Sequence, residues 1–351
     1  MTPEQAIALS LIRDLPRTTL TDRLLADDPE LLERADRHRS DAAQAVTAAA
    51  RLGIGVLPWN DPAFPPLLRA IPDCPPAIWL RGTPASIQAA LEAPTVAIVG
   101  SRAATALGLE IAAVLAADLA ARGVTVVSGL ARGIDSAAHR GALRTGRTVA
   151  VLGSGPDHIY PREHAGLAKE IAVDGVVLAE YPPGITPLPF HFPLRNRLIS
   201  GLSRAVVVIE AWEKSGSLIT AACAAEQGRE VMAVPGNPLT ERNRGGHGLI
   251  RDGATLVENA DQILMELGLV PPPGADGSPG EPGLFDAVRP LDDAGRLLAR
   301  MDRGQAYDAG ALAVLSRQPL ASVLALLLEL ELRGEVVRVG GGRFLRSGRP
   351  C

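Results

Sequence analysis

Two short arginine-bearing turns contain the residues whose types and spacing could hold a charged ligand. The first is Gly100-Ser101-Arg102, and the second lies in the stretch FPLRNRLISGLS, residues 192–203. Each turn stands where the chain is expected to pass from a strand or loop into a helix. An arginine beside the backbone N–H groups of a helix start forms a cradle for phosphate. Two such cradles on one sheet predict a polyphosphate ligand, either a nucleotide or a nucleic-acid strand.

The first turn lacks the glycine spacing of a dinucleotide-binding loop, and the chain contains no Walker loop. The groups left to hold a single phosphate are the Ser101 hydroxyl, the backbone amides and the Arg102 guanidinium. The residues leave one alternative open, which is a plain strand-to-helix turn that carries a surface arginine.

In the second block, Arg195 and Arg197 flank Asn196 just after Pro193, at a predicted first helical turn. Residues two apart diverge on a helix, so we expect one arginine to face a ligand and the other to pair with an acid. Phe192 either stacks on a nucleobase or packs in the core.

Two further loops are predicted to reach the same strand ends. In the motif GSGPDHIYP, Gly153 and Gly155 end another strand. The run Ser215-Gly216-Ser217 opens a helix with a serine suited to the N-cap position, and its amides form a third candidate anion site.

Residues suited to catalysis are few. His139 has no second histidine, cysteine or carboxylate clearly placed beside it, so a structural role is favoured. Glu210 and Glu213 are the only acids close to the third anion site, and a hydrolase would need such carboxylates in a pocket. Arg132 and Arg140 either add positive field to the strand ends or are simply solvated.

The elements that must position these residues follow from the apolar pattern. Hydrophobic residues make up 47% of the 351 residues but only 3% are aromatic, as buried parallel strands and close-packed helices require. Apolar strands are predicted at residues 95–100, 123–128, 147–153, 175–180, 205–210 and 230–234. Helices are predicted near residues 105–121, 133–145, 162–173, 195–203 and 217–228. This alternation predicts an α/β, Rossmann-like, doubly wound parallel sheet, whose ligands bind at the carboxyl ends of the strands.

Four segments are predicted along the chain. Residues 1–90 form a small helical N-terminal domain and a proline-rich connector, with one strand near Ala77–Leu80. Residues 91–268 form the Rossmann-like domain, and residues 269–287 form a Pro/Gly linker. In residues 288–351, helices followed by a two-stranded ribbon indicate a winged-helix-like domain.

Charge and cysteine content restrict the classes of function. The net charge of −4 excludes a polycation, so a basic surface must be local. Residues 288–351 carry ten arginines and seven acids, which allows nucleic-acid binding without arguing for it. Cys74, Cys223 and Cys351 show no metal-ligand or disulfide spacing, and neither a metal nor a cofactor is expected. No signal peptide and no membrane span is apparent, so we expect a cytoplasmic protein that does not contact a membrane.

The chain closely resembles the DNA-processing protein A family, DprA, also called Smf. The resemblance is dense over residues 95–265 and weaker on either side. It rests on these blocks, in chain order: GSRAATALG, SGLARGIDSAAHRGAL, AVLGSGPDHIYP, EYPPG, FPLRNRLISGLS, KSGSLITAACAAEQGREVMAVPGN and LIRDGA.

The resemblance implies a protein with no chemistry of its own. Family members bind single-stranded DNA without ATP in the strand-end pocket, form homodimers, and load RecA recombinase onto DNA that enters competent cells by natural transformation, displacing single-strand-binding protein. It implies that Arg102 is the main phosphate ligand. It also implies that the block Arg195-Asn196-Arg197, the loop with Gly153 and Gly155, and Ser215–Ser217 line the same pocket. A duplex DNA contact by the C-terminal domain is left open.

Two departures from the family pattern put individual contacts in doubt. A lysine that some members carry before the FP-x-RNR block is replaced by residues 187–191, PLPFH, and GGHG with His247 stands where an asparagine is usual.

The alternative function is that of a nucleotide-binding enzyme similar to nucleoside-monophosphate phosphoribohydrolases. Those enzymes should carry a Pro-Gly-Gly-x-Gly-Thr loop followed by glutamate, and this chain has KSGSLIT there. A conventional NAD-binding oxidoreductase is disfavoured because the glycine fingerprint is missing.

Overall fold

The fold is taken from a computed structural model, which describes residues 1–12, 15, 20–238, 240–269, 293–298, 300–302, 305–316, 318–332 and 334–346. The chain divides into two compact units, Met1–Pro271 and Pro272–Cys351. The predicted linker over residues 269–287 lies, apart from Leu269, outside the described residues. Each unit is described below by itself.

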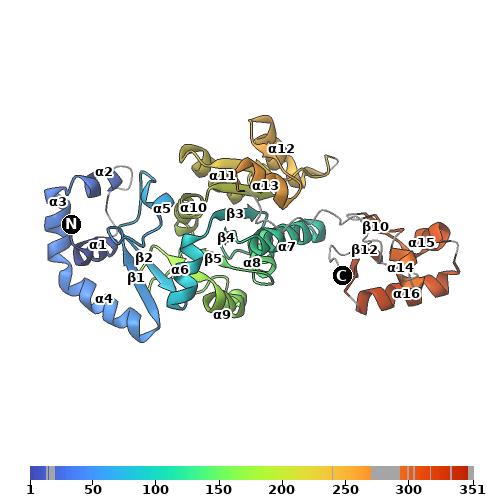
Figure 1. Ribbon diagram of the computed structural model, residues 1–351, viewed down its shortest axis with the longest axis horizontal. Coiled ribbons are helices and arrows are strands. Elements are labelled where there is room, and N and C mark those ends of the chain that lie inside the picture. The colour runs from blue at the N-terminus through green and yellow to red at the C-terminus, as the bar shows by residue number, and fades with distance from the viewer. Residues whose placement is uncertain are drawn as a thin grey trace, which may run out of the picture. The chain divides into compact units, whose positions relative to one another are not determined.

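The larger unit is built on one sheet. Among its described residues, nine strands are arranged in the order β1-β2-β6-β5-β4-β3-β7-β8-β9 (Figure 1). The pairs from β6 to β9 along this order are all parallel, which confirms the predicted parallel sheet. The strands are β1 (Ile54–Pro58), β2 (Ala77–Arg81), β3 (Thr95–Gly100), β4 (Thr125–Ser128), β5 (Thr148–Leu152), β6 (Val176–Ala179), β7 (Ala205–Ile209), β8 (Glu230–Ala233) and β9 (Thr255–Leu256).

Helices cover both faces of this sheet because its central strands carry buried apolar side chains on both faces. On β3, Val96 and Ile98 pack against α7 and α8, whereas Ala97 and Val99 face the opposite side and share a core with α10 and α11. The helices that follow β3 are α7 (Ala106–Ala121), α8 (Ile134–Ala142), α9 (Ala165–Asp174), α10 (His191–Gly201), α11 (Gly216–Glu226), α12 (Arg244–Arg251) and α13 (Ala260–Glu266), with 3₁₀ helices η1 (Arg162–His164) and η2 (Glu241–Asn243).

Helix α10 begins four residues earlier than the predicted 195–203. It starts at His191, so Phe192 and Pro193 lie inside its first turn. Proline is tolerated there because the first N–H groups of a helix have no intrahelical acceptor. The prediction placed the helix start after Pro193, and the error matters because Phe192 is a helical residue whose direction α10 fixes.

The proline-rich connector is more regular than predicted. It supplies the strand expected near Ala77–Leu80 as β2, and also a second strand, β1, that was not predicted. The two strands pair with each other in antiparallel fashion, and β2 joins the edge of the sheet antiparallel to β6. Proline excludes a long helix but permits short edge strands, which is why the composition alone did not reveal β1.

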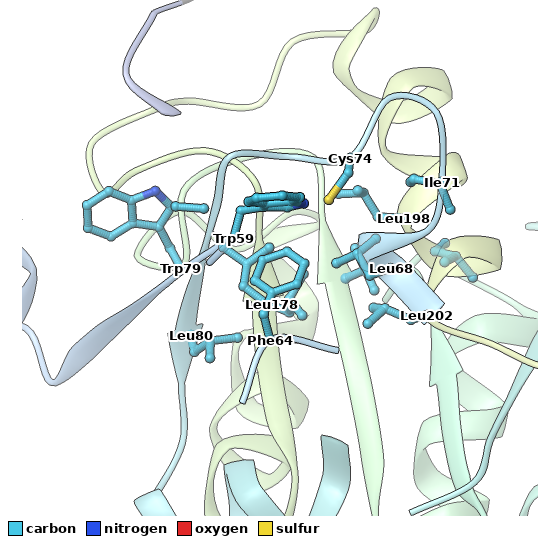
Figure 2. Close-up of a cluster of buried hydrophobic side chains, with 14 of the residues drawn as sticks. Trp59, Phe64, Leu68, Ile71, Cys74, Trp79, Leu80, Leu178, Leu198 and Leu202 are labelled. Carbon is cyan, nitrogen blue, oxygen red and sulfur yellow. The ribbon is translucent and has the colours of Figure 1, made fainter. Parts of the chain in front are cut away.

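Apolar side chains of the connector pack into the sheet and onto α10. Figure 2 shows Trp59, Phe64 and Leu68 of the connector beside Leu178 of β6 and Leu198 of α10. Phe64 and Leu68 are fully buried. The same core continues into the N-terminal helices, so residues 1–90 support the helix that carries the second arginine block. These helices are α1 (Pro3–Ser10), α2 (Leu20–Leu25), α3 (Pro29–Arg37), α4 (Arg39–Arg51), α5 (Pro66–Arg69) and α6 (Pro84–Glu92).

The smaller unit has its own core around Leu327 and Phe344. Its two predicted ribbon strands pair in antiparallel fashion, and β10 joins them in the order β10-β12-β11. A winged-helix fold for this unit stays a prediction. Its described elements are α14 (Asp293–Leu298), β10 (Ala306–Tyr307), α15 (Ala309–Ser316), α16 (Leu320–Leu332), β11 (Val336–Val339) and β12 (Arg343–Arg346).

No single described helix is long and apolar enough to cross a membrane, and the bent pair α15 and α16 reaches that length and composition only when taken together. No group of three or more histidine, cysteine or acidic side chains is arranged to hold a metal ion within the described ranges.

His139 is a buried structural residue of α8. Its Nδ1 lies 2.7 Å from the Thr148 hydroxyl, which itself donates to the carbonyl oxygen of Val126, so Nδ1 carries the proton and donates. Burial, together with nearby positive charges, lowers the pKa of His139 to about 3. The imidazole is therefore neutral in the folded protein, as its predicted structural role requires.

This neutral histidine should make stability depend on pH. Between the unfolded pKa of 6.5 and the folded pKa of about 3, only the unfolded chain binds this proton. Unfolding free energy should therefore fall as the pH drops through that window, by up to about 1.4 kcal/mol per pH unit from this residue. Urea denaturation of wild type and His139→Gln over the window measures it. If the slope of unfolding free energy against pH were equal in both proteins, the assignment of His139 as neutral in the folded protein would be refuted.

Candidate functional site

The candidate site lies where the order of the strands reverses. Connections after β3 lead outward through β4, β5 and β6, whereas β7 lies on the other side of β3 and leads to β8 and β9. Gly100 at the end of β3 is in register with Ile209 at the end of β7. Loops that leave two such strands diverge to opposite faces and open a crevice between them. A cavity of about 450 Å³ occupies this crevice.

Nine of the twelve predicted site residues line this cavity. They come from three separate segments: the turn after β3, helix α10, and the start of α11. The nine are Gly100, Ser101, Arg102, Phe192, Arg195, Asn196, Ser215, Gly216 and Ser217. Segments about ninety residues apart in the chain therefore meet at one strand edge, as the sequence predicted.

Two glycines allow the Ser101–Arg102 turn to form. A Cβ on Gly100 would lie 1.9 Å from the Ile209 carbonyl oxygen, and one on Gly133 would lie 2.2 Å from the carbonyl oxygen of Ser101. Gly133 also has φ +77°, which L-residues adopt with strain. The start of α8 and the turn after β3 thus pack backbone to backbone, and the Ile134 amide donates to the Ser101 carbonyl at 3.1 Å.

Arg195 brings a buried positive charge to the floor of the cavity. Its side chain is almost fully buried, and Nη1 donates to the carbonyl oxygens of Gly129, at 2.7 Å, and of Val151. A Cβ on Gly129 would meet the guanidinium at 2.6 Å, so glycine there makes room for the arginine. Burial lowers the pKa of Arg195 to about 10, which still leaves it charged at neutral pH.

Asp135 is the one carboxylate among the described residues that line the cavity. It accepts from the backbone amides of Gly129, at 3.2 Å, and Ala131, at 3.3 Å. Burial raises the pKa of Asp135, an effect that the positive charge of Arg195 partly opposes. The carboxylate holds the loop after β4 together and lies near Arg195 without a direct ion pair, and the interaction between the two charges partly offsets the positive field of the cavity.

Arg102 is exposed at the mouth of the cavity. Its Cζ lies 5.8 Å from the centre of the Phe192 ring, and the Phe192 and Tyr160 ring centres are 5.3 Å apart. A hollow of about 50 Å³ adjoins the cavity here and is lined by Arg102, Phe192 and Tyr160 among others. A cationic side chain and two aromatic rings are thus grouped at one edge of the site.

The start of α11 closes the third side of the cavity. Ser215 is the N-cap residue, and its hydroxyl accepts from the Ser217 amide at 3.4 Å, which confirms the predicted cap. The Asn196 side-chain amide donates to the Gly216 carbonyl at 3.2 Å and ties α10 to α11. Because Gly216 and Ser217 line the cavity, the positive end of the α11 dipole faces it.

The other three predicted site residues do not line the cavity. Arg197 is buried and pairs with Glu180 at 2.6 Å and with Asp73 of the connector at 2.8 Å. The two arginines of α10 therefore diverge as predicted, one towards the cavity and one to acids. A Cβ on Gly153 would press on Phe192, and one on Gly155 would lie 2.5 Å from the Pro182 carbonyl oxygen, so both glycines pack behind the site.

Sequence reasoning missed Trp212 and Gly129. Trp212 lines the cavity with 49% of its surface exposed, which is unusual for tryptophan in a chain with so few aromatic residues. Trp212 lies in the sequence between a predicted strand end and the serine suited to the N-cap position, and this position could have predicted its place at the site. Gly129 carried no such signal, because its contact with Arg195 joins positions 66 residues apart.

Glu210 and Glu213, the acids weighed as hydrolase candidates, are outside the cavity lining. Both carboxylate oxygens of Glu210 accept from the Thr105 amide, at 2.9 and 3.0 Å, and one also accepts from the Thr105 hydroxyl at 2.5 Å. Glu210 therefore fixes the start of α7. The fold and the site together define a Rossmann-like protein whose topological switch point holds a cavity lined by two arginines and a helix N-terminus.

Comparison with known proteins identifies the family. Residues 55–268 match the family described as DNA recombination-mediator protein A. Protein Smf of Escherichia coli is 41% identical over 301 residues, which are 84% of this chain and 78% of that protein. The DNA processing protein DprA of Bacillus subtilis is 36% identical over 261 residues, which are 74% of this chain and 86% of that protein. The chain belongs to the DNA recombination-mediator protein A family.

Solved structures agree with this assignment. The X-ray structure of DNA processing protein A from Streptococcus pneumoniae matches with a TM-score of 0.61 at 36% identity, over 76% of this chain and 93% of that one. DNA processing protein A from Helicobacter pylori, described for its unique single-stranded DNA binding mode, matches with a TM-score of 0.55 at 28% identity, over 61% of this chain and 95% of that one. The Rossmann-like fold is thereby confirmed.

Arg197 should be essential to stability. Replacing it by methionine removes the guanidinium that lies between the largely buried Glu180 carboxylate and the partly exposed Asp73 carboxylate. Arg197→Met should therefore lower the free energy of unfolding by about 3 kcal/mol in urea denaturation. The exposed Arg204 offers a matched control, and Arg204→Met should change it by less than about 0.5 kcal/mol. Equal effects in both variants would contradict the structural role of the buried ion pairs.

Proposed function

We propose that the switch-point cavity binds the backbone of single-stranded DNA and that the protein acts as a recombination mediator. The observation that carries this proposal is the meeting of Arg102, Arg195 and the N-terminus of α11 in one cavity. Guanidinium groups form strong charge-assisted hydrogen bonds with phosphate, and the amides of a helix N-terminus form a ready-made anion site. Because Arg195 is already desolvated, it loses little further hydration when an anion enters.

The aromatic residues favour an unpaired strand. Phe192 and Trp212 line the cavity, and Tyr160 lies beside Phe192. Trp212 and Tyr160 are each 49% exposed. Stacking on such rings needs bases that are not already stacked in a duplex, and it tolerates every base. The single-stranded DNA binding described for the Helicobacter pylori relative supports the same ligand.

We propose that the protein is a binding protein without catalytic activity. Acid–base hydrolysis needs carboxylates that are free to exchange protons at the ligand. Among the described residues lining the cavity, the only carboxylate is Asp135, which is engaged by two backbone amides, and Glu210 is engaged by Thr105. This arrangement disfavours the alternative of a phosphoribohydrolase-like enzyme.

The finer steps of the proposal rest on the family resemblance. The protein would form a homodimer and bind single-stranded DNA without ATP. It would load RecA recombinase onto DNA covered by single-strand-binding protein during natural transformation. The unit from Pro272 to Cys351 would be a winged helix with an optional duplex contact. A RecA filament-assembly assay on single strands coated with single-strand-binding protein tests the loading step. RecA filaments should assemble faster when this protein is added.

Arg102 should contribute strongly to affinity for single strands. Arg102→Ala removes a charge-assisted phosphate contact and should weaken binding of oligo-dT by about 1.5–3 kcal/mol, or roughly tenfold to a hundredfold. Fluorescence anisotropy measures the change. Arg251→Ala is the control, since Arg251 is exposed and does not line the cavity. Affinity that stays within twofold of wild type in Arg102→Ala would show that the phosphate site has been assigned to the wrong residue.

The class of ligand can be tested with the wild-type protein. Oligo-dT should bind more tightly than a duplex of equal length or a mononucleotide, and log Kd should vary with log salt by about 0.7 per phosphate contacted. An assay for free base after incubation with nucleoside monophosphates runs in parallel. Tight mononucleotide binding with base release would replace the proposed function by the enzymatic alternative.

A further inference from the structure

A second groove begins at Arg102 and is not used by the site described above. It has a volume of about 350 Å³ and lies between α7 and α8, with Leu109 and Ala113 of α7 on one side. Arg140 and Arg144 line the opposite side, and Arg102 lines both this groove and the switch-point cavity. The two hollows therefore share a rim at Arg102 and Ala103.

The spacing of the residues along α8 explains why the groove is basic. Ser136, Arg140 and Arg144 recur every four residues and so follow one face of the helix and its C-terminal turn, with each step advancing about 6 Å. His139, one residue from Arg140, is fully buried, which places Arg140 on the outer face. Both arginines of this row are exposed.

The arginines of the groove have no counter-charge within it. No carboxylate occurs among the described residues that line it, and neither Arg140 nor Arg144 forms an ion pair with a described residue. This concentration is local, since residues 95–265 carry sixteen basic and sixteen acidic residues. Like charges gathered in one hollow raise the local potential and attract an anion.

We propose that a DNA strand leaving the switch-point cavity continues along this groove, where Arg140 and Arg144 bind two further phosphates. The proposal rests on the proposed function and extends it from one cavity to a path. The groove has no aromatic side chain among its described lining residues, so it would hold the backbone and leave the bases free. The shared rim at Arg102 favours this occupant over an acidic protein surface, which would not need continuity with the cavity.

The test compares short and long oligonucleotides with the full-length protein. The variant is Arg140→Gln/Arg144→Gln, and Arg51→Gln/Arg251→Gln removes the same charge from exposed positions outside the groove. Oligo-dT of about 4 and about 20 nucleotides is titrated by fluorescence anisotropy at two salt concentrations. For the long strand, the groove variant should lower the slope of log Kd against log salt by about 1.4. A fourfold rise in salt should therefore raise the Kd of the groove variant by a factor about seven times smaller than for wild type. Its affinity for the short strand should stay within twofold.

The outcomes separate this inference from the proposed function. Arg140→Lys/Arg144→Lys should restore the wild-type salt slope, and thermal unfolding checks that each variant is folded. If the groove variant and the control bind the long strand alike while Arg102→Ala weakens both lengths, the cavity binds DNA but the path is wrong, and an acidic protein partner becomes the better occupant. If no variant, Arg102→Ala included, changes the affinity for either strand, the proposed function itself fails.

Discussion

The site depends on one interaction, the hold of two strand-end carbonyl groups on the buried guanidinium of Arg195. Gly129 and Val151 supply the carbonyl oxygens, one just after β4 and the other within β5. A charge withdrawn from water is costly unless its donors find acceptors. Here the sheet provides acceptors for Nη1, whereas the buried Nε of Arg195 has no hydrogen-bond partner among the described residues. The charge stays fixed at the floor of the cavity with its hydration already lost, and that is the preorganised state that binding an anion requires.

The rest of the fold keeps Arg195 in this position. Helix α10 carries the residue, and the connector packs against α10 around Leu198 (Figure 2). Arg197, two positions along the helix, is clamped between Glu180 and Asp73. One helix thus has an arginine paired with acids on one side and an arginine that lines the cavity on the other. The N-terminal segment contributes to the site by supporting α10, without lining the cavity that lies between β3 and β7.

The positive charge of the site is a local property. The whole chain has a net charge of −4, but its arginines create a positive potential where several of them lie close together. Arg102 stands at the rim shared by the cavity and the α7–α8 groove, so it belongs to both. Glycines at positions 100 and 133 make this possible, because any side chain there would separate the turn after β3 from α8. Close backbone packing therefore sets the place of the positive charge.

Much of this could be predicted from the sequence. Apolar runs alternating with helical patterns determined the parallel core, since burial on both faces demands uniformly apolar strands. Strand ends meet at one edge, so the motifs of Gly100, Arg195 and Ser215 had to converge. What only the tertiary structure decided depends on long-range contacts that leave no local pattern: β1 pairs through an edge of the sheet, Gly129 makes room for a guanidinium from α10, and Arg197 finds its acids in two distant segments. Periodicity reports which face of an element is buried, but the partner across that face is fixed only when the whole chain has packed.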